Sequence, residues 1–262
     1  MASSRSLYEV IFVAHFSAAQ PLTVLDMADW YNGVANRYPV FLQQPPWPTF
    51  NWYDFEASVP ETPLVSPNSR SYDYVPRIVA LSEDQRWSVN CQSDRVAVSW
   101  RRLEPTGQLT PYPGFENVLD EVLSVFEEFQ KWWHARFGVD VTFRICELNY
   151  FNAFPFKSGE RLLRVSEVFK AWVFRPGKMI ANLNVSWIVP PESSKHAQVQ
   201  CVAAMGATAD CPSAAIFNFA SSIRLGHRGS TGQLRPAYEA LHDAVTDAHI
   251  ATVNTETIGA QE

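Results

Sequence analysis

Two stretches of the chain, YEVIF at residues 8–12 and CELNY at residues 146–150, superpose when the sequence is shifted by 138 positions. At the same offset Phe16 falls on Phe154. Each stretch belongs to an apolar run rich in β-branched and aromatic residues, which predicts a strand. Similarity at a fixed offset indicates an internal duplication. We therefore expect the two strands to hold equivalent places in two related halves of the chain.

A helix is expected soon after the first strand. Thr23 and Asp26 have the spacing of a capping box, which marks a helix start, and Pro39 ends the run. Apolar residues recur between them with helical spacing and so predict the buried face of this helix. These apolar residues are Leu25, Ala28, Tyr31, Val34, Ala35 and Tyr38.

The other elements are predicted in the same way. The longest helix is expected at 115–137, where an apolar stripe lies opposite a face of acidic residues and Gly138 follows as a terminator. Two further helices are expected at 160–172 and from Pro236 onward. Strands are expected near 49–57, 77–82, 86–92, 95–103, 141–154, 179–189, 197–205 and 214–225.

This order of elements predicts an α+β protein. Internally duplicated strand–helix–strands–helix units would form a curved antiparallel sheet, or two such sheets, with helices packed on one face. The first unit would span 1–138 and carry a proline-rich insertion at 39–76, where eight prolines occur. The second would span 139–262, and the two are expected to share one fused globular core. The opposite face of the sheet would then be free to bind another molecule.

Composition excludes several classes of protein. The chain has 262 residues, a net charge of −6 and 13% aromatic residues, so it is neither disordered nor suited to binding nucleic acid along a basic stripe. Glu9 and His15 interrupt the apolar start, which argues against a signal peptide, and we expect no membrane span. The four cysteines are widely spaced, which favours reduced thiols in a cytoplasmic protein over a zinc site.

Charge is unevenly distributed along the chain. Residues 104–130 carry six acids and no Lys or Arg, whereas residues 157–178 carry six bases and two acids. Opposed patches of this kind can steer a protein partner or pair two copies of the chain as a homodimer. The alternative is that both are ordinary solvated helix faces.

A series of short motifs follows in order along the chain, at 9–13, 21–23, 37–39, 44–46, 94–95, 99–102, 112–116, 147–152, 242–243 and 255. In these motifs, and over nearly its whole length, the chain is similar to a sporadically distributed bacterial family of unknown function. Ser99 stands where that family tends to have Asn, and its usual late Trp is missing here. The resemblance implies no specific activity, but the patchy distribution of the family suggests mobile or defence-associated gene neighbourhoods.

No motif identifies catalysis, so we expect no catalytic residues, no metal and no cofactor. Glu239, His242 and His249 are spaced like metal ligands on one helix, yet one such motif alone favours a solvated helix face. The glycine-rich run 226–232 lacks the ending of a P-loop and is interpreted as a connection. Glu9 and Glu147 interrupt apolar strands. Each is expected to pair with an arginine, Arg101 or Arg144, and the alternative is a catalytic carboxylate with a raised pKa.

Aromatic residues among prolines, together with arginines, suit a contact surface, although core packing is the alternative for the tryptophans. Our first hypothesis is a non-enzymatic binding or regulatory protein that recognises a macromolecular partner, such as an antitoxin-like or defence-system accessory subunit. The alternatives are a small-molecule-binding or hydrolytic cavity between sheet and long helices, and nucleic-acid binding by a concave sheet face. The candidate binding residues are Trp47, Trp52, Tyr53, Trp100, Arg101, Arg102, Glu147, Tyr150, Asn152, Arg161 and Arg164.

Overall fold

The computed structural model describes most of the chain. Predictions for Trp52, Tyr53 and Arg161, and for the strand at 49–57, lie outside the described residues. The described residues are 7–17, 22–47, 76–102, 111–155, 163–164, 179–180, 183–189, 199–208, 211–225 and 231–252.

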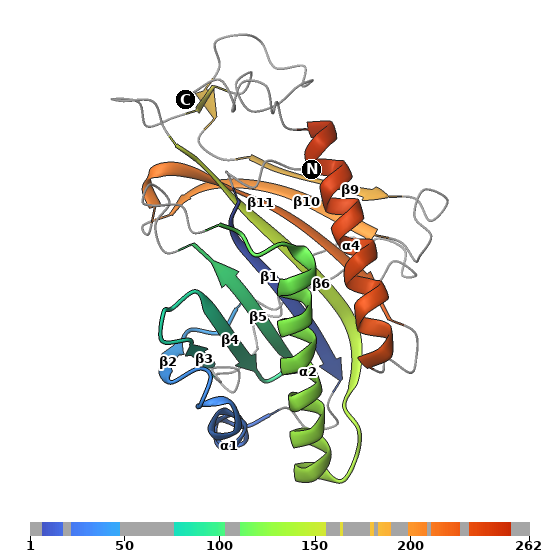
Figure 1. Cartoon of the computed structure of the whole chain (residues 1–262). Helices are drawn as coiled ribbons and strands as arrows, with labels where there is room; N and C mark the ends of the chain where they lie inside the picture. The colour runs from blue at the N-terminus through green and yellow to red at the C-terminus, as the bar shows by residue number, and fades with distance from the viewer. Residues whose placement is uncertain are drawn as a thin grey trace, which may run out of the picture.

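The protein is α+β, as predicted: one curved antiparallel sheet carries helices on one face (Figure 1). The described helices are α1 (Val24–Val34), α2 (Phe115–Phe137) and α4 (Thr231–Thr252). The sheet has the order β2-β3-β4-β5-β1-β6-β11-β10-β9, and β7 and β8 form a separate pair. The strands are β1 (Leu7–Ser17), β2 (Val40–Gln44), β3 (Arg77–Leu81), β4 (Trp87–Gln92), β5 (Arg95–Arg101), β6 (Thr142–Pro155), β7 (Leu163–Arg164), β8 (Met179–Ile180), β9 (Leu183–Val189), β10 (Val199–Thr208) and β11 (Cys211–Arg224).

The strands that contain residues 8–12 and 146–150 lie side by side at the centre of the sheet. β1 pairs with β6, and Ile11 lies directly opposite Asn149, its equivalent at the offset of 138. Outward from β1 the strands run β5, β4, β3, and outward from β6 they run β11, β10, β9. A long helix follows each series, α2 in one half and α4 in the other. This order is the one that a duplicated unit would produce, and the duplication itself stays a prediction.

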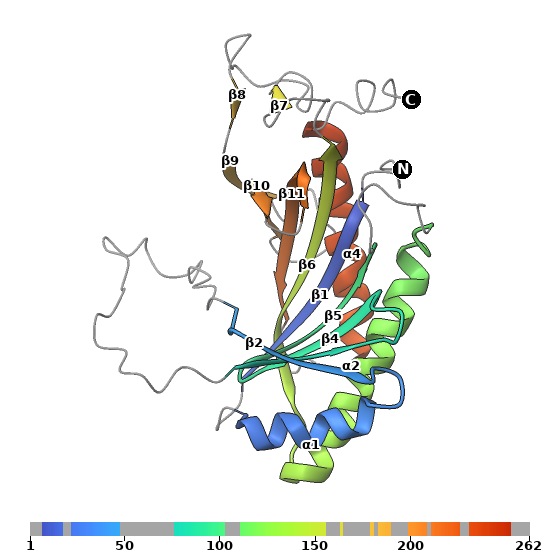
Figure 2. The same ribbon diagram turned by 90° about the vertical axis from the view of Figure 1, so that its left-hand side faces the viewer.

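The hydrophobic core lies between the sheet and the two long helices (Figures 1 and 2). Strand side chains alternate between faces, so Val10, Phe12, Ala14 and Phe16 of β1 all point to the helix side. They meet the apolar stripe of α2, which the sequence predicted correctly, and Gly138 ends that helix with φ 71°. Among the described residues no helix is long and apolar enough to cross a membrane.

The start of α1 was predicted correctly, but its buried face only in part. Thr23 and Asp26 form the capping box, with 3.0 Å from the Thr23 nitrogen to the Asp26 carboxylate. Val34 and Tyr38 of the predicted stripe are buried, whereas Leu25 is 79% exposed, and Met27 and Trp30 are buried without having been predicted. The helix is apolar on more than one side, so periodicity alone did not identify its buried face. It also ends at Val34 rather than continuing to Pro39.

Other boundaries differ from the prediction. β2 lies within the proline-rich insertion and was not predicted, because its five residues are flanked by prolines at 39 and 45. The predicted helix at 160–172 is wrong at β7, and its other residues lie outside the described part of the chain. α4 begins at Thr231, so Pro236 lies inside the helix rather than opening it.

Candidate protein-interaction surface

The sheet separates the candidate binding residues into two groups. Consecutive strand residues point to opposite faces, so Trp100 and Arg102 lie on the helix side and Arg101 on the other side, which we call the open face. Glu147 also lies on the open face, whereas Tyr150 and Asn152 lie on the helix side. The structure therefore does not gather the predicted residues into one site. Arg164 lies in β7, but nothing is described of its side chain.

The first polar cluster of the open face surrounds Glu9. Glu9 lies opposite Arg101 in the β1–β5 pairing, as the sequence analysis expected. Burial raises the pKa of the Glu9 carboxyl, while a hydrogen bond with Ser99 and the charges of Arg101 and Arg77 oppose that rise. Hydroxyl groups extend the cluster across the strands, since the Ser99 and Ser88 oxygens are 2.7 Å apart. Glu9 is thus an acid held by its neighbours within the fold.

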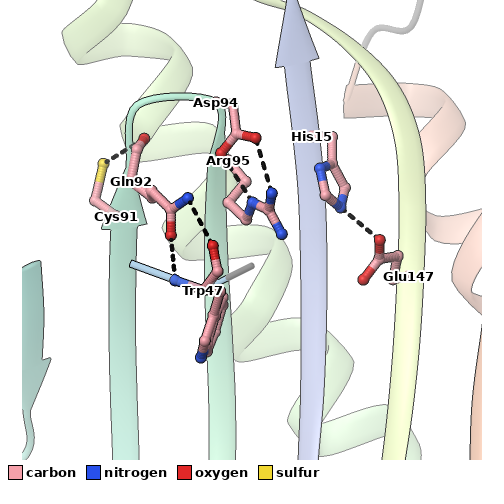
Figure 3. A network of polar contacts seen from close by, with 7 residues as sticks. All are labelled: His15, Trp47, Cys91, Gln92, Asp94, Arg95 and Glu147. Carbon is pink, nitrogen blue, oxygen red and sulfur yellow. Dashed lines mark hydrogen bonds and ion pairs between the residues drawn. The ribbon is translucent and has the colours of Figure 1, made fainter. Parts of the chain in front are cut away.

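The second polar cluster lies at the other end of the same strands (Figure 3). His15 Nε2 on β1 is 2.6 Å from Glu147 Oε1 on β6, and both side chains are almost fully buried. The described partner of Glu147 is therefore His15 rather than Arg101 or Arg144, and Arg144 is exposed. Nearby, the Arg95 guanidinium binds both carboxylate oxygens of Asp94 at 2.8 Å.

Trp47 is held at the edge of this cluster through its backbone. Its N–H donates to Gln92 Oε1 at 2.9 Å, and the Gln92 amide donates back to the Trp47 carbonyl at 3.3 Å (Figure 3). The Arg77 guanidinium lies 4.1 Å from the centre of the indole ring. Trp47 therefore packs on charged and amide groups of its own chain. The open face carries polar groups that bind one another, which stabilises a sheet but leaves few groups for a ligand.

On the helix side, the predicted residues belong to the core and its border. Trp100 is 2% exposed, so core packing describes it better than partner contact. Tyr150 Oη is 2.7 Å from His242 Nδ1, and burial lowers the pKa of this histidine. His242 stacks on Phe115 with ring centres 4.0 Å apart. Rings of the sheet and both long helices are in contact, for example Phe12 with Tyr238 at 5.1 Å, so side chains fill the described interior.

The residues spaced like metal ligands on the last helix have different environments. Glu239 is exposed and lies 3.9 Å from Arg235, whereas His249 is 4% exposed and packs on Phe219. Within the part of the chain that the structure describes, no group of three His, Cys, Asp or Glu residues could hold a metal ion. Only the last two residues of the glycine-rich run, Thr231 and Gly232, are described, and they begin α4.

Two arginines of the same chain partly offset the charge of the acidic face of α2. Arg37, which follows α1, binds Glu121 at 2.7 Å and Glu128 at 2.6 Å. Arg235 on α4 binds Glu116 at 3.3 Å and also contacts Asp120. These contacts join α2 to its neighbours. They also reduce the charge that the sequence suggested as a steering patch, whose basic counterpart at 157–178 lies mostly outside the described residues.

A different surface stands out by its exposed apolar side chains. Six of the seven exposed large apolar residues in the described part of the chain come from α1, β2 or the end of α2 (Figure 2). Leu25 is 79% exposed and Val139 is 60% exposed. Exposed apolar groups gathered at one place mark an interaction site more often than scattered ones do. The residues of this kind on or next to the helices are Val24 and Leu25 of α1, Phe137 at the end of α2, and Val139, which follows α2.

A groove lies between α1 and α2, the helices that carry Val24, Leu25 and Phe137. It has a volume of about 350 Å³, and the indoles of Trp30 and Trp132 form its apolar walls. Trp132 also contacts Phe137, with ring centres 5.9 Å apart, which connects the groove to the exposed residues. We call the groove together with Val24, Leu25, Phe137 and Val139 the α1–α2 surface. The groove is lined by Trp30, Gly33, Val34, Asn36, Arg37, Glu128, Lys131 and Trp132.

Polar contacts hold α1 in place on α2 and so preorganise this surface. Arg136 Nη2 lies 3.1 Å from Asp26 Oδ1, and Trp132 Nε1 donates to Asp29 at 2.9 Å. Burial would raise the pKa of the Asp26 carboxyl, but hydrogen bonds from Thr23 and Arg136 outweigh it, so the pKa is lowered. Asp26 is therefore charged at neutral pH and anchors both the start of α1 and the end of α2.

The sequence analysis did not nominate the α1–α2 surface. Leu25 was assigned to a buried stripe, and Trp132 and Phe137 were not considered as contact residues. A signal was nevertheless present, because α1 has apolar residues at both Leu25 and Met27, on different sides of the helix. A short helix that is apolar on several sides has more apolar surface than one core contact can bury.

Comparison with known proteins does not assign a function to this surface. The chain matched no family model and no curated protein. Its function therefore has to be inferred from the geometry.

Proposed function

We propose that this chain is a non-enzymatic binding or regulatory protein that recognises a protein partner through the α1–α2 surface. The observation that carries the proposal is the 79% exposure of Leu25 on α1, the helix that forms a groove together with Trp132 of α2. Trp132 is half-buried on the groove wall and can anchor a partner, because Trp residues bury a large area on binding and lose little conformational entropy. Trp30 is 3% exposed and belongs to the core below the groove. Apolar groups at the centre with charged groups around them are the usual composition of a protein contact.

The charges around the groove suit a protein partner of mixed polarity. Lys131 is exposed on its rim, while Arg37 is already paired with Glu121 and Glu128. A partner would place an apolar side chain in the groove and an acidic group near Lys131. The groove is open and has apolar side chains beside polar ones such as Asn36 and Lys131, so a protein segment of mixed polarity fits it better than a metabolite does.

The open face of the sheet is less suited to binding a partner than the α1–α2 surface, which supports the proposal. Three of its arginines lie near carboxylates of the same chain, since Arg95 binds Asp94 while Arg77 and Arg101 act on Glu9. Nucleic-acid binding needs cations that can release counterions from phosphates, and paired arginines do so poorly. The packed core between sheet and helices likewise favours a surface interaction over a ligand cavity.

The likeness to a sporadically distributed bacterial family suggests which kind of partner to seek. An antitoxin-like or defence-system accessory subunit acts by covering a partner, so an exposed apolar surface is all that such a role requires. We therefore propose this role as the finer form of the binding function.

Site-specific photo-crosslinking tests the proposal. A photoreactive phenylalanine analogue at Leu25 should capture one protein in cells that encode this chain, and mass spectrometry would identify it. The same analogue at Asp247, which is exposed on α4, serves as the control position. The identified protein is then purified and its binding measured. Equal capture from both positions, or no binding by the purified protein, would refute the proposal.

A further inference from the structure

A second surface, distinct from the α1–α2 surface, is the outer edge of the sheet. Among the described strands, β2 is the last on its side of the sheet, and β3 is its one described neighbour. Every second residue of an edge strand points its backbone N–H and C=O away from the sheet. No hydrogen bond of the described residues takes those groups of Val40–Gln44. The edge therefore offers a template for another strand.

β2 lacks the features that usually protect an edge. Its sequence, VFLQQ, contains no charge, and no proline or bulge lies within it. Phe41 is 43% exposed and Leu42 is 39% exposed, and the two point to opposite faces of the sheet. Natural sheets place charges, Pro or bulges on their edges to prevent pairing, so an uncharged apolar edge is a strand that can pair.

The neighbours of β2 continue its surface on both faces. On the helix side, the Phe41 ring lies 4.6 Å from Tyr31 of α1. On the other side, Arg77 binds Gln44 and stacks on Trp47. An added strand would thus lie next to apolar side chains on one face of the sheet and next to polar side chains on the other.

We propose that β2 pairs with β2 of a second copy of this chain, antiparallel and about a two-fold axis. The strand suits itself as a partner, since pairing centred on Leu42 opposes Leu42 to Leu42, Phe41 to Gln43 and Val40 to Gln44, with no charge to repel. Two-fold pairing closes after two copies, whereas pairing β2 with the other edge, β9, would grow without limit. It also continues the antiparallel pattern of the whole sheet.

The dimer is expected to be weak, because prolines at 39 and 45 limit the paired strand to five residues. Interfaces of this small size belong to reversible associations. Sedimentation equilibrium of the full chain over a broad micromolar range should show a monomer–dimer exchange. A monomer at every concentration, or assemblies larger than a dimer, would overturn the proposal.

Substitutions that place a charge at the centre of β2 give the decisive test. Leu42→Lys places two ammonium groups opposite each other and should weaken the dimer at least tenfold, as should Leu42→Glu. An equimolar mixture of the two variants should form a heterodimer again, because opposite charges then meet across the axis. Val139→Lys, on the α1–α2 surface, should leave the dimer unchanged. Circular dichroism confirms that each variant is folded.

The experiment with the mixed variants shows whether the dimer interface lies at β2 or elsewhere. If Leu42→Lys and Leu42→Glu dimerise as the natural chain does, the interface lies elsewhere and the proposal fails. If neither dimerises and the mixture does not recover, the strands do not meet at Leu42 and the proposal also fails. The test needs no partner protein, so its outcome is independent of the function proposed above.

Discussion

The open face of the sheet and the α1–α2 surface differ in how their side chains are satisfied. On the open face, buried polar groups bind one another, as His15 binds Glu147 and Arg95 binds Asp94. On the α1–α2 surface, large apolar groups such as Leu25 remain exposed on the helices that form a groove. Polar residues that interrupt apolar strands were the first candidates for function, but in the structure they stabilise the fold. The apolar residues that are left exposed are the better indicator of binding.

The comparison predicts that substitutions on the open face affect stability most. Glu147→Ala leaves His15 without its buried partner and should lower the free energy of unfolding by about 2–3 kcal/mol. Urea denaturation followed by circular dichroism measures the change. A loss smaller than about 0.5 kcal/mol, the range of ordinary surface substitutions, would show that the His15–Glu147 pair adds little.

A smaller effect is expected where α1 is anchored. Thr23→Ala removes the side chain that caps the helix and should cost about 1 kcal/mol of unfolding free energy. Thr23→Ser keeps the hydroxyl and is the matched control, which should stay close to the natural chain. Equal losses in the two variants would mean that the cap does not hold α1 in place.

The Glu9 cluster predicts a pH dependence of known sign. Because burial raises the pKa of Glu9, the folded chain binds its proton more tightly than the unfolded chain does. Its contribution to stability is therefore greatest below the ordinary pKa of 4.5 and falls as the pH rises through the higher folded pKa. Glu9→Gln removes this titration.

The measurement is the difference in unfolding free energy between the natural chain and Glu9→Gln, taken from pH 4 upward. This difference should shift against the natural chain as the pH increases. A constant difference would show that Arg77 and Arg101 offset the effect of burial on the pKa of Glu9. A shift in favour of the natural chain would show that they outweigh it.

The smallest effect on stability is expected at the α1–α2 surface. Leu25→Ser should change the free energy of unfolding by less than about 0.5 kcal/mol, because the side chain buries little area in the folded chain. The same denaturation experiment measures it. A loss above 1 kcal/mol would assign Leu25 to the fold and remove the contrast between the two regions.

The sequence was sufficient for elements with a single strong pattern. The stripe of α2, the capping box at Thr23 and the pairs of strands around 87–101 were predicted because local spacing determines them. The buried face of α1 was predicted only in part, since Leu25 and Met27 both fit a helical period and only packing decides between them. β2 was missed because five residues between prolines carry too little pattern.

Contacts between distant residues were harder still. Arg101, one of the two arginines expected near the strand glutamates, lies opposite Glu9, but no spacing along the chain shows that Glu147 contacts His15, which is 132 residues away. The candidate site was divided because neighbouring residues, such as Arg101 and Arg102, point to opposite faces of the sheet. The groove between α1 and α2 depends on tertiary packing, so no spacing along the chain indicates it.

The central claim is tested most directly by the affinity for the protein captured at Leu25. Calorimetric titration would compare the natural chain with Leu25→Asp and with Ser88→Ala, a substitution on the open face. Leu25→Asp should weaken binding at least tenfold, about 1.4 kcal/mol, while Ser88→Ala should leave the dissociation constant within about twofold. Unchanged binding by Leu25→Asp, with a loss in Ser88→Ala, would contradict the account and return the binding function to the open face.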